Sequence, residues 1–298
     1  MSTLASITDR IIATLQGASR DQAEQTHLVA GIADTDLTLQ AFEPKLLSQG
    51  LIEIGDELLW VSAVDNGSGS VTIAPYGRGV QTSAPSAHDA GAMIVNNPRF
   101  PRALIRASVN DAISGVYPDL YARKTYEFPA VATRVSYEIP AEAEQVHRVS
   151  WQDIGPSKRW IPVSRWRFDP AASTDDFPTG KSLDLYQAPL PGRTVRVVYQ
   201  RPPAPFTDSS TEFATATGLN ASAEDCIVYG ALFRLVGMLE APRLQLAAIE
   251  SQLRGQLVQP GATQSAVRHY MQLYQLALTA ERERLLRSDP VSAHYRYI

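Results

Sequence analysis

The chain has 298 residues, of which 44% are hydrophobic and 19% are charged. This length allows two modest domains or one elaborated domain with a substantial core, and the composition is that of a globular protein. Acidic residues outnumber basic residues by 31 to 27, so the formal net charge is −4. Proteins that grip nucleic acid cluster Lys and Arg to neutralise phosphates. This excess of acidic residues argues against tight DNA binding. It does not argue against a protein that DNA passes without being bound.

The single cysteine, Cys226, excludes an internal disulfide framework. It lies in the apolar segment CIVYGALFRLV, which favours a small buried side chain over a nucleophile. The first residues lack the basic and then apolar pattern of a signal peptide, and no segment approaches the roughly 20 apolar residues that span a membrane. We therefore expect synthesis in a reducing cytoplasm and no contact with a membrane.

An amphipathic helix is predicted over residues 3–16, where apolar side chains recur at helical spacing. They are Leu4, Ile7, Ile11, Ile12 and Leu15. Gly17 ends the pattern, and the polar residues 18–28 indicate a loop. A lone helix of this length is marginally stable in water, so it must pack against helices elsewhere in the chain.

Short strand patterns separated by turns occupy residues 29–96. The strand candidates are DLTLQA, LIEI, ELLWVSAV, SVTIAPY and AMIV. Gly55-Asp56 is a predicted tight turn, and DNGSG at 65–69 is a second turn signal. Five or six strands in about 70 residues are best satisfied by a small closed β-barrel, because closure removes exposed strand edges.

A helical pattern returns over residues 100–117, where Pro101 fits the first turn and Pro118 ends the helix. Residues 125–201 are again rich in strand patterns. The five candidates are YEFPAVATRVSYEIP, EQVHRVSWQD, RWIPVSRWRFDP, SLDLYQA and RTVRVVYQ. In the last of them, Val195, Val197 and Tyr199 face one way, and Thr194, Arg196 and Val198 face the other. This pattern predicts an antiparallel sheet or sandwich.

Three helices are predicted after a proline-rich connector that begins at Arg201. Their segments are AEDCIVYGALFRLVGMLE, PRLQLAAIESQLRGQL and QSAVRHYMQLYQLALTAERERLLRS. Ser222 is the expected N-cap of the first helix, with Asp225 as its acidic partner three residues on. In the third helix, a stripe is expected to pack on the other two: Val267, Met271, Tyr274 and Leu278.

The fold class that follows is α+β. A helical bundle is expected from residues 1–28, 97–122 and 220–288. A small β-barrel is inserted at residues 29–96, and an antiparallel β-sheet or sandwich domain occupies residues 123–205. The last ten residues, 289–298, form an extended C-terminal docking arm.

Residues with catalytic or ligand chemistry are sparse. The histidines are scattered without metal-ligand spacing: His27, His88, His147, His269 and His294. The Gly77-Arg78-Gly79 turn lacks the lysine and following helix of a phosphate loop. We therefore expect no metal, no cofactor and no enzymatic activity. Because the members of a catalytic triad lie far apart in a chain, a hydrolase using Arg78, His88 and Asp89 stays open as an alternative.

Aromatic side chains gather in the second β-rich region: Trp151, Trp160, Trp166, Phe168 and Tyr186. Beside them lie Arg159, Arg165 and Arg167. Such a set can stack on single-stranded nucleic acid. A sheet core with arginine stems packed over it explains the same pattern, and the acidic total favours this second interpretation.

The segments IEIGDELLWVSAV and VTIAPYGRGVQTSAPSAHDAGAMIV resemble a small β-module of tailed-phage structural proteins. The matching positions are Asp56, Glu57, Val61, Val64, Arg78, Gly79, Thr82, Ala84, Ala87, His88, Gly91 and Ala92. The pattern usually has glycine before the threonine, where this chain has Gln81. The resemblance covers about 45 residues and implies a structural loop of a β-barrel. That loop is formed by Gly77, Arg78, Gly79, Thr82, His88 and Gly91.

The order of elements along the whole chain is similar to that of phage head-to-tail connector adaptors. This resemblance implies a virion neck protein, made in the host cytoplasm, that forms a ring of about twelve copies around the DNA exit channel. A portal protein would lie above the ring, and a tail, stopper or nozzle protein below it. DNA would pass without sequence-specific binding. A tail or baseplate component is the alternative within the same class.

The end of the last helix and the arm are the expected contacts with the portal and with neighbouring copies. The residues are Arg282, Arg284, Arg287, His294, Tyr295, Arg296, Tyr297 and Ile298. Tyrosine and arginine are common interface anchors. The alternative for the arm is that it stays disordered.

Overall fold

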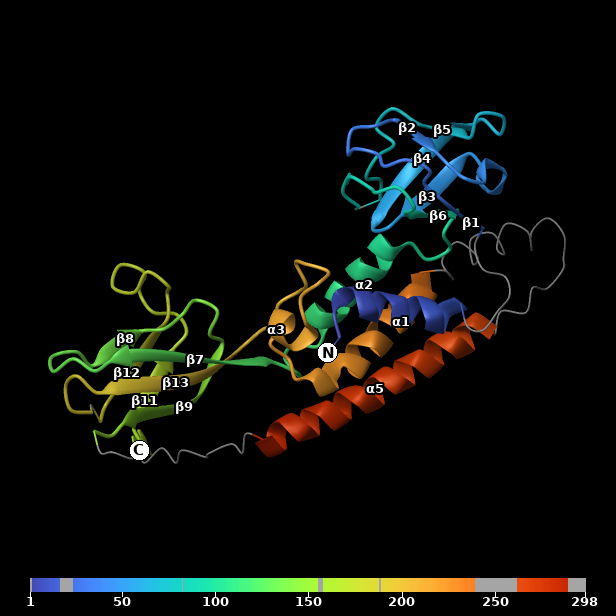
Figure 1. Ribbon diagram of the computed structural model, residues 1–298. Coiled ribbons are helices and arrows are strands. Elements are labelled where there is room, and N and C mark those ends of the chain that lie inside the picture. Colours follow the sequence, from blue (N-terminus) through green and yellow to red (C-terminus); the bar gives the residue numbers. More distant parts are fainter. Residues whose placement is uncertain are drawn as a thin grey trace.

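The computed structural model describes residues 2–16, 24–81, 83–154, 158–187, 189–238 and 262–288. The fold is mixed α+β, with a helical part between two β-rich parts (Figure 1). The six-stranded sheet lies beyond α2 (Arg102–Gly115), and the other sheets lie beyond α3 (Phe213–Thr217). Within the described residues, no helix is both long and apolar enough to cross a membrane.

The helical part packs around one hydrophobic cluster. Its helices are α1 (Leu4–Gln16), α2, α3, residues 224–238 and α5 (Ala262–Ser288), with the 3₁₀ turn η2 (Ala221–Ala223) before the fourth. The N-terminal helix buries Leu4, Ile7 and Ile11 in the cluster, as its spacing predicts. Cys226 is also fully buried there, and desolvation raises the pKa of its thiol to about 12. The thiol is therefore a core group rather than a nucleophile at neutral pH.

The first β-rich part is one antiparallel sheet in the order β1-β6-β3-β4-β5-β2. Its strands are β1 (Gln25–His27), β2 (Thr38–Gln40), β3 (Gly50–Ile54), β4 (Glu57–Val64), β5 (Ser70–Ile73) and β6 (Met93–Asn96), and η1 (Pro44–Leu46) follows β2. A single bridge between Leu28 and Ala41 connects the ends of the two edge strands. The sheet therefore curls around its own cluster of apolar side chains.

The second β-rich part consists of two antiparallel sheets, β10-β9-β13-β7 and β11-β12-β8. The strands are β7 (Ala122–Pro129), β8 (Ser136–Glu138), β9 (Gln145–Gln152), β10 (Trp160–Pro162), β11 (Trp166–Asp169), β12 (Ser182–Leu185) and β13 (Thr194–Arg201). Both sheets contribute side chains to one shared cluster, as in a sandwich. In β13, Val195, Val197 and Tyr199 are buried, which confirms the predicted alternation.

Some local predictions differ from the structure. Residues 25–27 form β1 instead of a loop, and they pair with β6. Only Thr26 of this strand is buried, so no apolar alternation marks it in the sequence. The supposed connector contains the short helix α3, which buries Phe213 against the cluster.

The predictions for the C-terminal helices are also corrected in part. The hydroxyl of Ser222 donates to Glu281 at 2.7 Å rather than capping a helix. Met271 is exposed, and Tyr270 packs on the cluster together with Tyr274 and Leu278. The predicted middle helix, PRLQLAAIESQLRGQL, and the arm at 289–298 lie outside the described residues.

Candidate functional site

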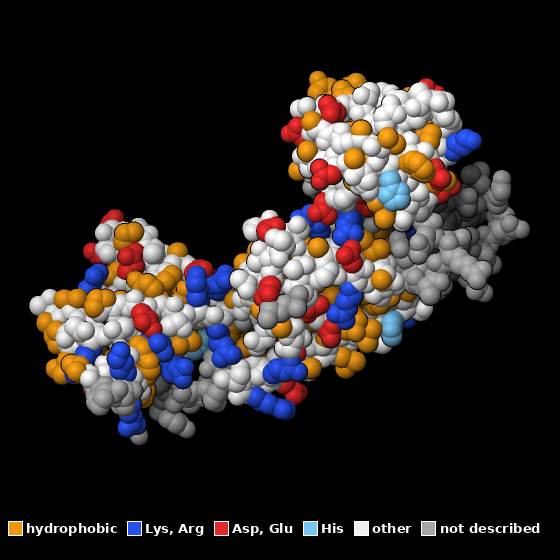
Figure 2. Space-filling view, viewed as in Figure 1, with side chains coloured by type: hydrophobic (Ala, Val, Ile, Leu, Met, Phe, Trp, Pro, Cys, Tyr) orange, Lys and Arg blue, Asp and Glu red, His pale blue; other side chains and the backbone are white. Residues whose placement is uncertain are grey.

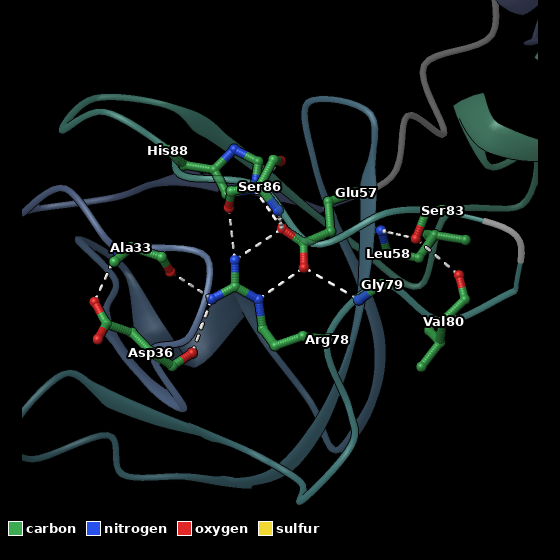
Figure 3. A network of polar contacts seen from close by, with 10 residues as sticks. All are labelled: Ala33, Asp36, Glu57, Leu58, Arg78, Gly79, Val80, Ser83, Ser86 and His88. Atoms are coloured by element: carbon green, nitrogen blue, oxygen red, sulfur yellow. Dashed lines mark hydrogen bonds and ion pairs between the residues drawn. The ribbon is translucent and has the colours of Figure 1, made fainter.

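The loop between β5 and β6 folds over a buried carboxylate, Glu57 (Figure 3). Glu57 is the first residue of β4 and its side chain is 0% exposed. Leu59 and Val61, at the same strand parity, are buried with it. The pleat of β4 therefore aims the carboxylate into the module and not into solvent.

Arg78 holds both oxygens of this carboxylate. Its Nε donates to Oε1 at 2.7 Å and its Nη2 donates to Oε2 at 2.9 Å. The remaining N–H groups donate to the carbonyl oxygens of Ala33, Asp36 and Ser86 at 2.7–2.8 Å. All five donors of the guanidinium are thereby used, and one side chain ties three loop segments together.

His88 and two backbone amides complete the shell around Glu57. The Nε2 of His88 lies 2.8 Å from Oε2, and a carboxylate only accepts, so this nitrogen carries the proton. The N–H groups of Gly79 and Ser86 each donate to the carboxylate at 3.1 Å. Burial on its own would raise the pKa of Glu57, but Arg78, His88 and the Ser86 amide outweigh it and lower the pKa.

The glycines of the loop permit its path. Gly79 has a φ of 63°, and a Cβ there would lie 2.4 Å from the Cδ of Pro85. At Gly77, a Cβ would lie 2.8 Å from the carbonyl oxygens of Ala74 and Trp60. Both positions therefore require glycine for contact reasons, and Gly79 requires it for its backbone conformation as well.

The structure brings together only part of the candidate loop residues. Arg78 and His88 meet at Glu57, and Gly77 and Gly79 shape the turn beside them. Gly91 has a φ of 85° and open space around it. Thr82 lies outside the described residues.

The group proposed for a hydrolase is not assembled as a unit. Asp89 is exposed, and the ring of His88 contacts Glu57 instead. Neither of the two described clefts is lined by Glu57, Arg78 or His88. The polar atoms of Glu57, Arg78 and His88 form hydrogen bonds with one another and with the loop backbone. This cluster therefore acts as a structural brace that holds the loop in place.

Sequence reasoning missed Glu57 as the partner of both cations. The available signal was its position: an acid at the same parity as Leu59 and Val61 on a strand has to point inward. Within the described residues, no group of three or more His, Cys, Asp or Glu side chains is arranged to hold a metal ion.

Most of the aromatic residues singled out in the second β-rich part pack on its core, whereas Tyr186 is 61% exposed. Trp151, Trp166 and Phe168 pack against the shared cluster. The guanidinium of Arg196 lies 3.6 Å from the ring centre of Trp160. Arg159, Arg165 and Arg167, which the sequence singled out, are exposed instead. This arrangement matches the interpretation as a sheet core covered by arginine stems, although the covering arginine is a different residue.

The end of α5 presents exposed arginines that pair with acids. Arg284 contacts Glu281 at 2.7 Å, Arg287 contacts Glu283 at 3.4 Å, and Arg282 contacts Asp119 at 3.5 Å. Arg282 and Arg287 form exposed pairs, which contribute little to stability, so these two cations remain available for other contacts, whereas the acid paired with Arg284 is buried. The other candidates, His294, Tyr295, Arg296, Tyr297 and Ile298, lie outside the described residues.

A family model described as SU10 adaptor protein matches residues 86–292, which is more than half of the chain. The chain belongs to the SU10 adaptor protein family. It is accordingly a structural adaptor protein of a phage. No curated protein matches the chain.

The match to the SU10 adaptor family begins at Ser86, inside the braced loop. It covers β6, α2, the second β-rich part and α5, but not β1 to β5. The family assignment therefore rests on the helices and the sandwich, independently of the Arg78-Gly79 turn.

Proposed function

We propose that the protein is the head-to-tail adaptor of a tailed phage, forming a ring beneath the portal that joins the capsid to the tail. The ring of about twelve copies would surround the DNA exit channel. The observation that carries this proposal is the family match over residues 86–292, together with an architecture that places β-rich parts at opposite ends of a helical part (Figure 1). Its partners are a portal protein above and a tail, stopper or nozzle protein below.

The proposed division into domains follows the three hydrophobic clusters. The bundle consists of residues 1–28, 97–122 and 220–288, the small barrel of residues 29–96 and the sheet domain of residues 123–205. Each of these ranges carries most of one cluster, and residues 289–298 would form the docking arm. In the ring, the bundle would supply the contacts between copies, and the β-rich parts would face other proteins.

The charge distribution suits a channel through which DNA moves. The net charge is −4, and acidic and basic side chains are interspersed over the face shown in Figure 2. A strongly basic lining would hold DNA by many phosphate contacts, whereas a mixed and mildly acidic surface lets it pass. We therefore propose passage of DNA without sequence-specific binding.

The contacts between copies are assigned to the outer side of α5. Leu276 is 69% exposed on this helix, while Tyr274, Ala277 and Leu278 face the cluster. A ring needs two different surfaces that meet head to tail, and an exposed leucine on a long helix is a suitable contact for one of them.

The experiment is assembly of the purified protein alone and with its portal, followed by negative-stain imaging. Rings or portal-bound rings are expected. Leu276→Asp should reduce ring formation, whereas Leu190→Asp, at a residue 65% exposed in the sandwich, should not. A protein that stays monomeric and never associates with a portal would refute the proposal.

Docking of the arm has a separate test. A chain that ends at Ser288 lacks the aromatic tail His294–Ile298 but keeps α5. We expect this chain to assemble with itself as the full chain does and to bind the portal at least tenfold more weakly. A tenfold loss corresponds to about 1.4 kcal/mol, which is within the reach of one aromatic anchor. Unchanged portal binding would remove the arm from the interface.

A further inference from the structure

A second buried carboxylate, Glu53, lies where the six-stranded sheet meets the helical bundle. Its side chain comes from β3, and the residue is 5% exposed. Its Oε1 accepts a hydrogen bond of 2.5 Å from the backbone N–H of Arg102, the first residue of α2. Pro101 at the N-cap provides no side-chain cap. The sheet therefore caps the helix through the carboxyl group of Glu53.

Ion pairs from three elements surround this contact. Arg102 bonds Asp9 of α1 at 2.8 Å and Asp56 of the β3–β4 turn at 3.4 Å. Arg106, one turn further along α2, bonds Asp56 at 2.6 Å. Asp9 and Asp56 form ion pairs with the guanidinium groups of the two arginines. The hydrogen bond to Glu53 comes instead from the backbone N–H of Arg102.

A cleft of about 850 Å³ adjoins Glu53. Its walls include Leu15 of α1, Val95 of β6 and Phe100 of the linker, and the charged groups Glu24 and Arg99 also face it. The sheet and the helices are therefore not tightly packed along this border.

We propose that the Glu53–Arg102 contact is a pH-sensitive hinge between the six-stranded sheet and the helical bundle. With Glu53 protonated, the carboxyl stays buried at the start of α2 and the hinge is closed. With Glu53 ionised, the sheet rotates away from α2, and the carboxylate gains water from the cleft. The hinge is a property of this junction and does not depend on the proposed place in the virion.

The electrostatics set the direction of the effect. Desolvation raises the pKa of Glu53 from the ordinary 4.5 to about 7, against the Arg102 N–H and charge, while Asp56 adds to the rise. A carboxyl whose pKa is raised in the closed form stabilises that form fully below the ordinary value. The stability is lost as pH rises through 4.5 toward 7. Closure is therefore favoured by acid and weakened near and above neutral pH.

Hydrogen exchange of the full-length protein at pH 6 and pH 8 tests the hinge. The measured quantity is the protection of amides in residues 97–106, corrected for the intrinsic change of exchange rate with pH. If the pKa of Glu53 is about 7 in the closed form and the ordinary 4.5 in the open form, the equilibrium constant for opening is about tenfold larger at pH 8 than at pH 6. Amides of β13 in the sandwich should keep equal protection at both values.

Two variants separate the hinge from a merely structural contact. Glu53→Gln keeps an oxygen that accepts the Arg102 N–H but cannot ionise, so its protection should be the same at both pH values. Asp65→Asn, in the exposed turn between β4 and β5, should retain the tenfold change of the wild type.

Three results would overturn the proposal. The first is equal protection of residues 97–106 at pH 6 and pH 8 in the wild type. The second is a tenfold change that persists in Glu53→Gln. The third is an equal change in β13, which would indicate global instead of local opening. If Glu53→Gln does not fold, the comparison of the two segments in the wild type still decides.

Discussion

A buried carboxylate is a costly component for a module of this size, so the surroundings of Glu57 explain why it is tolerated. Removing an ion from water costs several kcal/mol unless its hydrogen bonds are replaced. Glu57 accepts five hydrogen bonds, from Arg78 twice, from His88 and from two backbone amides. These hydrogen bonds replace those to water, so the carboxylate can lie at the centre of the loop.

Replacing Arg78 tests this balance. Arg78→Met leaves Glu57 buried and short of its main partner, so the free energy of unfolding should fall by about 3–5 kcal/mol. Urea denaturation at pH 7 measures it. Arg287→Met is the matched control, because that side chain is 83% exposed and its ion pair is on the surface, so a change below about 0.5 kcal/mol is expected. Equal losses in the two variants would contradict the brace.

The acid dependence of Glu57 gives an independent test. Because its pKa is lowered in the folded protein, its ionic contacts stabilise the fold above the ordinary value of 4.5 and are lost as pH falls below it. The difference in unfolding free energy between the wild type and Glu57→Gln should therefore be largest at pH 7 and shrink below pH 4.5. Urea titrations at several pH values measure it, and a constant difference would argue against an ionised, paired carboxylate.

At the scale of elements, the loop between β5 and β6 depends on glycine for two separable reasons. Gly79 combines a positive φ with a contact that a Cβ would violate, whereas Gly91 has a positive φ and open space. Gly91→Ala should cost about 1–2 kcal/mol from backbone strain alone. Gly79→Ala should cost more, because Pro85 has to move as well. Thermal denaturation of both variants checks the order, and a larger loss at Gly91 would contradict the described path of the loop.

Helix α5 offers a test of its packed face through two adjacent leucines. Leu285 is buried against the bundle, whereas Leu286 is about half exposed. Leu285→Ala should lower the unfolding free energy by about 2–5 kcal/mol, as buried leucines do. Leu286→Ala should change it by less than about 1 kcal/mol. If the two variants lose equal stability in urea, the orientation of α5 on the bundle is wrong.

The elements that were predictable from the sequence are those whose own residues show their burial. Strands β3 to β5 and helix α1 present apolar side chains at a clear period, so their type and approximate position follow from the pattern. β1 escaped prediction because it buries one threonine and is held by pairing with β6, 68 residues away in register at Thr26 and Ile94. A strand of this kind exists only through its tertiary partner.

The candidate site was half predictable for the same reason. Arg78, His88 and the glycines were recognisable as loop residues, and the strand parity of Glu57 indicated an inward side chain. The contact of Arg78 and His88 with Glu57 was not predictable. The two residues are 21 and 31 positions from Glu57 in the sequence, and only the path of the loop brings them to it. Asp89 is exposed and takes no part in the cluster, as expected for the neighbour of His88, because adjacent side chains in an extended segment point apart.

At the scale of the whole molecule, the helices form the middle and the β-rich parts extend from it in different directions (Figure 1). This shape suits a subunit that contacts its own copies through helices and other proteins through its ends. The family match covers the sandwich and the helical part apart from α1, which are parts that ring formation and partner binding would use.

Locating the subunit in the phage particle is the most direct test of the central claim. An image reconstruction of the virion, with the subunit marked by a fused tag or an antibody, is sufficient at low resolution. We expect a ring of about twelve copies between the portal and the tail, around the axis along which DNA leaves. Density for the subunit only in the tail or the baseplate, or none in the particle, would contradict it.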